Sequence, residues 1–210
     1  MINSWNDYKL IFENILNSPG FSRTQLPHRL KYAHIDIDII PFGDISSDNQ
    51  IRCFDDDSFI LNVLGYREVY ENSISCQINN IVFKVTSLEG FIITKLLAWS
   101  DRSHITKKDA EDLGIILFNY TDLNPDELFL NFSHLIESPN YDYVLTGVKI
   151  IGEKLGIFID NSTELKNEVN SILQNELSDP DNSLLAAHLN KIETYEYNYT
   201  ILKTLYDTLF

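Results

Sequence analysis

The pattern of apolar positions changes along the first half of the chain. Residues 6–16 carry apolar side chains three and four positions apart, the spacing of one helix face, and Pro19-Gly20 follows as a stop signal. Residues 33–40 instead alternate isoleucine with mostly polar side chains, which predicts a strand closed by Pro41. Two short alternating runs around Asn79-Asn80 predict a hairpin, because asparagine tolerates the positive φ of a tight turn. The apolar positions of the first helix are Tyr8, Ile11, Ile15 and Leu16.

From Leu88 onward the pattern is helical. Thr106 is the predicted N-cap of one helix, and Pro125 followed by acidic residues begins another. A small sheet with one helix therefore precedes a helical region, and this order predicts an α+β fold. The predicted helical segments are residues 88–102, 106–120, a helix beginning at 124–127, and residues 141–156, 162–177 and 180–209.

Composition narrows the class of protein. A chain of 210 residues with 44% hydrophobic residues suits one domain, or one domain with a helical extension. The net charge of −15 repels phosphate backbones, which argues against non-specific nucleic-acid binding. Two cysteines without metal-ligand spacing indicate neither a zinc site nor a disulfide framework. With no secretory signal and no apolar run of ~20 residues, we expect a cytoplasmic protein with no membrane segment.

Carboxylates recur within the predicted strand. Because successive side chains of a strand point to opposite faces, Asp36 and Asp38 share one face with His34, and the isoleucines form the core face. The two aspartates lie roughly 6.6 Å apart at the backbone, within reach of a common Mg²⁺ ion. His34 is expected to be a bystander, because imidazole is a poor Mg²⁺ ligand. The alternative is a solvated strand face on an acidic protein.

A second charged group lies on the helices after residue 88. Lys95 and Arg102 are seven residues apart on one helix, so they face the same way about 10 Å apart. Asp109 and Asp112 are three residues apart and share one face of the next helix. Taken singly, Lys95 fits a surface lysine with a buried stem, and Asp109 fits a favourable charge in a first helical turn.

Taken together, these segments resemble a known family. IDIIPFG at residues 37–43 and KLLAWSDR with KKDAEDL between residues 95 and 113 are similar to the nucleotidyl transferase family of the AbiE type, which includes toxins of type IV toxin–antitoxin systems. The resemblance extends from about Trp5 to Tyr120. It implies a polymerase-β-like nucleotidyltransferase region at residues 1–120, with a mixed sheet flanked by helices, and a C-terminal helical region at residues 121–210.

The resemblance also implies a chemistry. A nucleoside triphosphate bound with Mg²⁺ would pass its α-phosphate to an acceptor, a reaction that depends on charge neutralisation and in-line positioning. By match to the family motif, Asp38 would be a third carboxylate on the central strand, completing the metal site or taking the acceptor proton. Asp36 is a second metal-ligand candidate.

The helical residues match the family's later motifs. Lys95 would contact the triphosphate with support from Arg102, and Asp109 would lie near the active centre. Asp112 would orient groups within the same motif. The acceptor is expected to be a small molecule or a protein rather than RNA, because the lysines are scattered over an acidic chain.

One part of the family pattern is missing. The family has a Gly-Ser turn followed by an Asp-x-Asp pair on an earlier strand, and neither precedes Asp36 in this sequence. Two explanations stay open: the chain is a shortened form that begins after those carboxylates, or Asp36 and Asp38 act alone as the metal pair. The missing segment also allows a different function, that of a catalytically inactive relative that binds a cognate partner protein.

Overall fold

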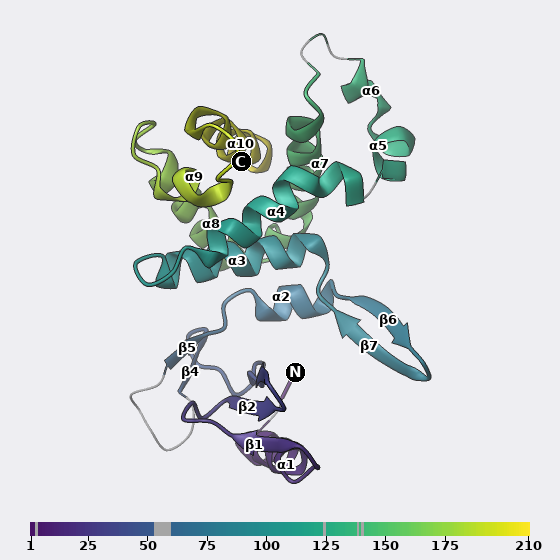
Figure 1. Cartoon of the computed structure of the whole chain (residues 1–210), viewed down its shortest axis with the longest axis vertical. Coiled ribbons are helices and arrows are strands. Elements are labelled where there is room, and N and C mark those ends of the chain that lie inside the picture. The colour runs from purple at the N-terminus through teal and green to yellow at the C-terminus, as the bar shows by residue number, and fades with distance from the viewer. Residues whose placement is uncertain (3, 53–59, 124, 138, 140) are drawn as a thin grey trace. The chain divides into compact units, whose positions relative to one another are not determined.

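The chain divides into two compact units, Met1–Arg67 and Glu68–Phe210, and each is described by itself. The computed structural model in Figure 1 describes residues 1–210 except residues 3, 53–59, 124, 138 and 140. Residue 120, the predicted end of the nucleotidyltransferase-like region, lies inside a helix of the second unit. Of the described helices, none combines the length and apolar character that crossing a membrane requires.

The first unit begins with a helix and a small antiparallel sheet. Helix α1 (Trp5–Leu16) starts at Ser4, whose hydroxyl accepts a hydrogen bond from the backbone N–H of Asp7. Strands β1 (Phe21–Arg23), β2 (Arg29–Tyr32) and β3 (Ile35–Asp38) follow in antiparallel order β1-β2-β3. Tyr8 and Phe12 of α1 bury their rings against Leu30 of β2, so this helix covers the sheet.

The aspartate strand differs from its prediction in three ways. It is shorter than residues 33–40, because Ala33 adopts a φ of 52° and forms the turn to β2 together with His34. Ile35 is exposed at the tip of this hairpin, outside the cluster that includes Ile39, so the isoleucines do not form a continuous core face. Strand β3 also lies at the edge of the described sheet, whereas the family resemblance implied a central strand.

A second small sheet completes the first unit. Strands β4 (Gln50–Arg52) and β5 (Ile60–Asn62) pair antiparallel, and Ile51 packs with Val63 in a separate apolar cluster. Every strand pair among the described residues is antiparallel, so the mixed sheet implied by the resemblance is not what these residues form.

The second unit confirms the predicted hairpin. Helix α2 (Tyr66–Glu71) leads into β6 (Ile74–Ile78) and β7 (Ile81–Val85), which pair antiparallel around Asn79. Asn79 has a φ of 54°, the conformation for which the sequence favoured asparagine.

The rest of the second unit is helical, which confirms the α+β class with a helical C-terminal region. The helices are α3 (Leu88–Arg102), α4 (Lys108–Leu123), α5 (Pro125–Asn131), α6 (Ser133–Ile136), α7 (Tyr143–Ile159), α8 (Thr163–Leu177), α9 (Leu184–Leu189) and α10 (Tyr195–Leu209). Helix α4 packs against α3, α7 and α9, and α10 packs against α7, so the core lies among the longer helices (Figure 1).

Two helix predictions are corrected. Residues 180–209 form α9 and α10 rather than one helix, because Asn190 adopts an extended conformation and Thr194 caps a new helix by accepting a hydrogen bond from the Tyr197 N–H. Thr106 accepts a hydrogen bond from the Lys108 N–H, but α4 begins only at Lys108, so Thr106 lies one residue before the cap position.

Candidate functional site

The charged residues predicted on the helices come together in the second unit. Lys95 and Arg102 extend from α3, and Asp109 and Asp112 lie in the first turns of α4, where α3 and α4 pack together. We refer to these four residues as the Asp109 cluster. The short turn of residues 103–107 brings the start of α4 back to the cationic side of α3.

Asp109 is the centre of this cluster. Arg102 binds it in a bidentate manner: Nε donates to Oδ2 at 2.7 Å, and Nη2 donates to Oδ1 at 2.7 Å. Lys95 Nζ donates to Asp109 Oδ1 at 3.1 Å and to Asp112 Oδ2 at 2.6 Å. One carboxylate thus receives hydrogen bonds from both cations, and the second carboxylate receives one from Lys95.

Burial and charge act in opposite directions on Asp109, whose side chain is only 1% exposed. Burial alone would raise the pKa of the Asp109 carboxyl, but the hydrogen bonds from Arg102 and Lys95 outweigh it and hold the pKa below its usual value. Lys95 is itself largely covered and lies 5.1 Å from the centre of the Phe91 ring. Asp109 is therefore ionised at neutral pH.

The arrangement has two chemical capacities. Two cations and two carboxylates balance in charge, so the cluster joins α3 to α4 as an ionic network. The Arg102 side chain is 51% exposed, so the cluster can be reached from solvent on the side of Arg102, whereas Lys95 is largely covered. A planar guanidinium next to a lysine is a combination that recognises phosphate groups.

The aspartates of β3 have a different environment in the first unit. Arg29, which pairs with Asp38 across β2 and β3, donates Nε to Oδ1 at 2.6 Å and Nη2 to Oδ2 at 2.8 Å. Its Nη1 also lies 3.6 Å from Asp36 Oδ2, so one guanidinium holds both carboxylates. In this arrangement the oxygens of both carboxylates face the positive charge of Arg29, which a Mg²⁺ ion bound here would have to displace.

A second ionic network, which the sequence analysis missed, lies among four helices. Lys154 Nζ of α7 is 2.7 Å from Glu89 Oε1 of α3 and 3.1 Å from Glu127 Oε1 of α5. It also donates to the Tyr120 hydroxyl of α4 at 2.8 Å. Burial would raise the pKa of Glu89, but the hydrogen bonds from Lys154, from the backbone N–H of Glu89 and from Ser87, with the positive charge of Lys154, together outweigh it and lower the pKa. The available signal was Glu89 itself, an acid within an otherwise apolar helical segment.

This network gives a stability prediction. Replacing Lys154 with methionine leaves the buried Glu89 without its charged donor, so we expect the free energy of unfolding to fall by about 1–2 kcal/mol. The value is modest because Lys154 is one-third exposed and Tyr120 still lies beside Glu89. Chemical denaturation followed by circular dichroism measures it, and unchanged stability would contradict the role assigned to Lys154.

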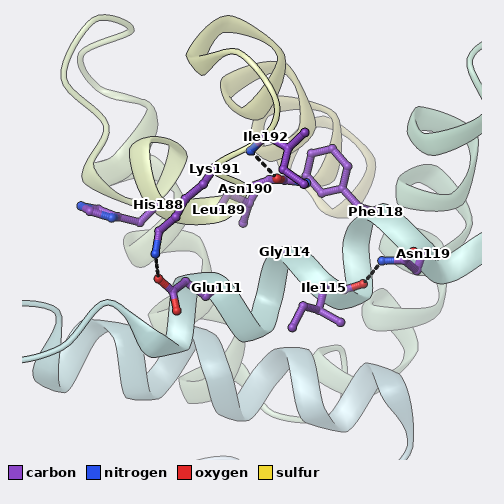
Figure 2. Close-up of a pocket in the computed structure, with 10 residues that line it drawn as sticks. All are labelled: Glu111, Gly114, Ile115, Phe118, Asn119, His188, Leu189, Asn190, Lys191 and Ile192. Carbon is purple, nitrogen blue, oxygen red and sulfur yellow. Dashed lines mark hydrogen bonds and ion pairs between the residues drawn. The ribbon is translucent and has the colours of Figure 1, made fainter.

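A surface cavity of about 390 Å³ lies between α4 and the segment that joins α9 to α10. Ile115, Phe118 and Ile192 give it an apolar lining, and Lys191 pairs with Glu111 at its rim (Figure 2). None of the predicted site residues lines this cavity.

Comparisons of this chain with known proteins found no similar family, protein or structure. The chain matches no family model, and no curated protein or solved structure is significantly similar to it. Within the described ranges, no group of three or more histidine, cysteine, aspartate or glutamate side chains is arranged to hold a metal ion.

Proposed function

We propose that this chain is a nucleotidyltransferase-like protein, which binds a nucleoside triphosphate with Mg²⁺ and transfers a nucleoside monophosphate to an acceptor. The observation that carries the proposal is the Asp109 cluster. Lys95 and Arg102 reach the same carboxylate, Asp109, at the spacing that resembles the family motif.

The chemistry of the transfer explains why such a cluster suits it. The acceptor oxygen attacks the α-phosphorus, the bond to the bridging oxygen of the β-phosphate breaks, and pyrophosphate leaves. Negative charge grows on the phosphate oxygens, so a fixed lysine and a bidentate arginine stabilise the transition state. Asp109 and Asp112 hold the two cations in fixed positions, which keeps the cost of reorganisation low.

In this proposal Mg²⁺ enters the site already bound to the nucleotide. The metal travels with the triphosphate as part of the substrate, which agrees with the occupation of Asp36 and Asp38 by Arg29. The two aspartates stay candidates for a carboxylate role, Asp38 as the acceptor of the proton and Asp36 as a metal ligand. They belong to the first unit and the Asp109 cluster to the second.

Calorimetric titration tests this proposal. In the presence of Mg²⁺ we expect saturable binding of at least one of ATP, GTP, CTP and UTP. Lys95→Met should weaken that binding about 10–100-fold, the effect of losing a charge-assisted hydrogen bond. A radiolabelled α-phosphate then reports transfer to acceptors in a cell extract.

The matched control is Lys154→Met, which removes a lysine of comparable ionic environment from the other network of the same unit. It should leave nucleotide affinity unchanged even if it lowers stability. Absence of heat with all four nucleotides, or equal weakening by both variants, contradicts the proposal.

A second candidate function is that of an inactive relative that binds a partner protein. The observation that favours it is the bidentate hydrogen bonding of Arg29 to Asp38. Both oxygens of a carboxylate that catalysis would need are bound to Arg29 in this way. Arg29→Ala discriminates between the two functions. If the chain is an enzyme held back by this bond, the variant should bind Mn²⁺ more tightly and gain transfer activity. If it is a binding module, the variant should gain neither, and the wild-type chain should co-purify with one partner.

A further inference from the structure

The β6–β7 hairpin has one apolar and one polar face. The register pairs Ile74 with Val85, Cys76 with Phe83 and Ile78 with Ile81, and these pairs alternate with Ser75–Lys84 and Gln77–Val82. Because alternate residues of a strand share a face, the first three pairs form one continuous apolar face. We call it the hairpin face; its residues are Ile74, Cys76, Ile78, Ile81, Phe83 and Val85.

The hairpin face is exposed. Its five large side chains are between 43% and 61% exposed, and Cys76 is an exposed free thiol. These side chains present on the order of 500 Å² of apolar surface, near the upper end of the range for the largest patch on a typical monomer. A two-stranded hairpin is marginally stable alone and normally gains stability from packing of its apolar face.

A contact that the hairpin makes with its own unit is on the opposite face. Lys84 Nζ lies 4.4 Å from the centre of the Tyr70 ring of α2. Lys84 belongs to the polar face, together with Ser75 and Gln77. This contact with α2 therefore uses the polar face and leaves the hairpin face uncovered by Tyr70.

Charge favours one kind of occupant. From Asn72 to Leu88 the only charged side chain is Lys84, in a chain whose net charge is −15. Two identical acidic chains repel each other, and this repulsion is weakest where a surface carries little charge. The hairpin face is such a surface. Its shape is also self-complementary, because a two-fold axis parallel to the strands places the small Cys76 of one copy opposite the bulky Phe83 of the other.

We propose that the hairpin face is a self-association surface through which two copies of this chain pack face to face. The two faces together would bury on the order of 1,000 Å², the lower bound for a specific interface, so the dimer is weak. We expect a dissociation constant on the order of 10–100 µM, and tighter association in high salt, because salt screens the repulsion between two acidic chains.

Sedimentation equilibrium of the full chain over a concentration series tests this proposal. The wild-type chain should pass from monomer to dimer, and Phe83→Lys should weaken association at least tenfold because it places a charge at the centre of the face. Val82→Lys is the matched control. It adds the same charge at the next residue, on the opposite face, and should dimerise like the wild type.

Thiol reactivity provides a readout that does not depend on the Phe83 variant folding. In a Cys53→Ser background, Cys76 is the remaining cysteine, and its rate of reaction with a thiol reagent should fall as the dimer forms. A chain that stays monomeric to millimolar concentration overturns the proposal. So does a dimer in which Cys76 keeps its monomer reactivity, or one that Phe83→Lys and Val82→Lys leave equally intact.

Discussion

Replacing Asp109 with asparagine is expected to lower the free energy of unfolding by about 3 kcal/mol, the cost of breaking a buried ion pair by removing one partner. Asparagine has nearly the same shape, so no cavity forms. However, one carboxylate oxygen that accepts hydrogen bonds from Arg102 and Lys95 becomes an amide donor, and Lys95 is too covered for water to compensate fully. For a unit of this size the melting temperature should fall by about 6–12 °C.

The same variant has a characteristic pH dependence. A carboxyl whose pKa is lower in the folded state contributes stability above its ordinary pKa near 4, and this stability is lost as the pH falls through the lowered value. Because the pKa of Asp109 is lowered, the wild-type chain should lose stability steeply below about pH 4. Asp109→Asn should have a shallower slope there. Glu89, whose pKa is also lowered, contributes the same slope to both proteins.

The matched control is Asp112→Asn. Asp112 is more exposed than Asp109, and among the described residues its side chain pairs with Lys95, so we expect a loss below about 1 kcal/mol. Urea denaturation of the three proteins at pH 7, 5 and 3.5 measures both effects. Equal losses for the two variants would show that Asp109 is not the centre of the cluster.

The Asp109 cluster could be predicted because its geometry is local. Residues seven apart on one helix share a face, and so do residues three apart on the next helix. The turn between the two helices has only five residues, so the helices are expected to pack against each other. The sequence could not show that Asp109 is the buried member, since a carboxylate in a first helical turn is exposed in most helices.

The environment of Asp36 and Asp38 could not be predicted in the same way. The contact with Arg29 depends on the antiparallel register of β2 and β3, which is set by the turn at Ala33. The alternating pattern predicted a strand that includes Ala33, and alanine carries no turn signal. The Lys154 network could not be predicted from the sequence for a different reason. Its members come from four helices and meet only when these helices pack.

Gly114→Ala is expected to have the second large effect, a loss of about 3 kcal/mol in the free energy of unfolding. A Cβ atom at residue 114 of α4 would overlap the backbone carbonyl oxygen of Leu189, at the end of α9 (Figure 2). Overlap with backbone cannot be relieved by rotating a side chain, so α9 must move away from α4. The apolar cavity between these segments should then change shape, which amide exchange near Asn190 would detect.

Gly156 of α7 supplies the control that separates overlap from helix propensity. A Cβ atom there meets no heavy atom within 4 Å, so Gly156→Ala should stabilise the chain by about 0.5–1 kcal/mol. The same chemical change at two helical glycines is therefore expected to have opposite signs. If thermal denaturation shows both variants to be stabilised, the prediction is wrong. The end of α9 then does not pack on α4 as closely as the distance between Gly114 and Leu189 indicates.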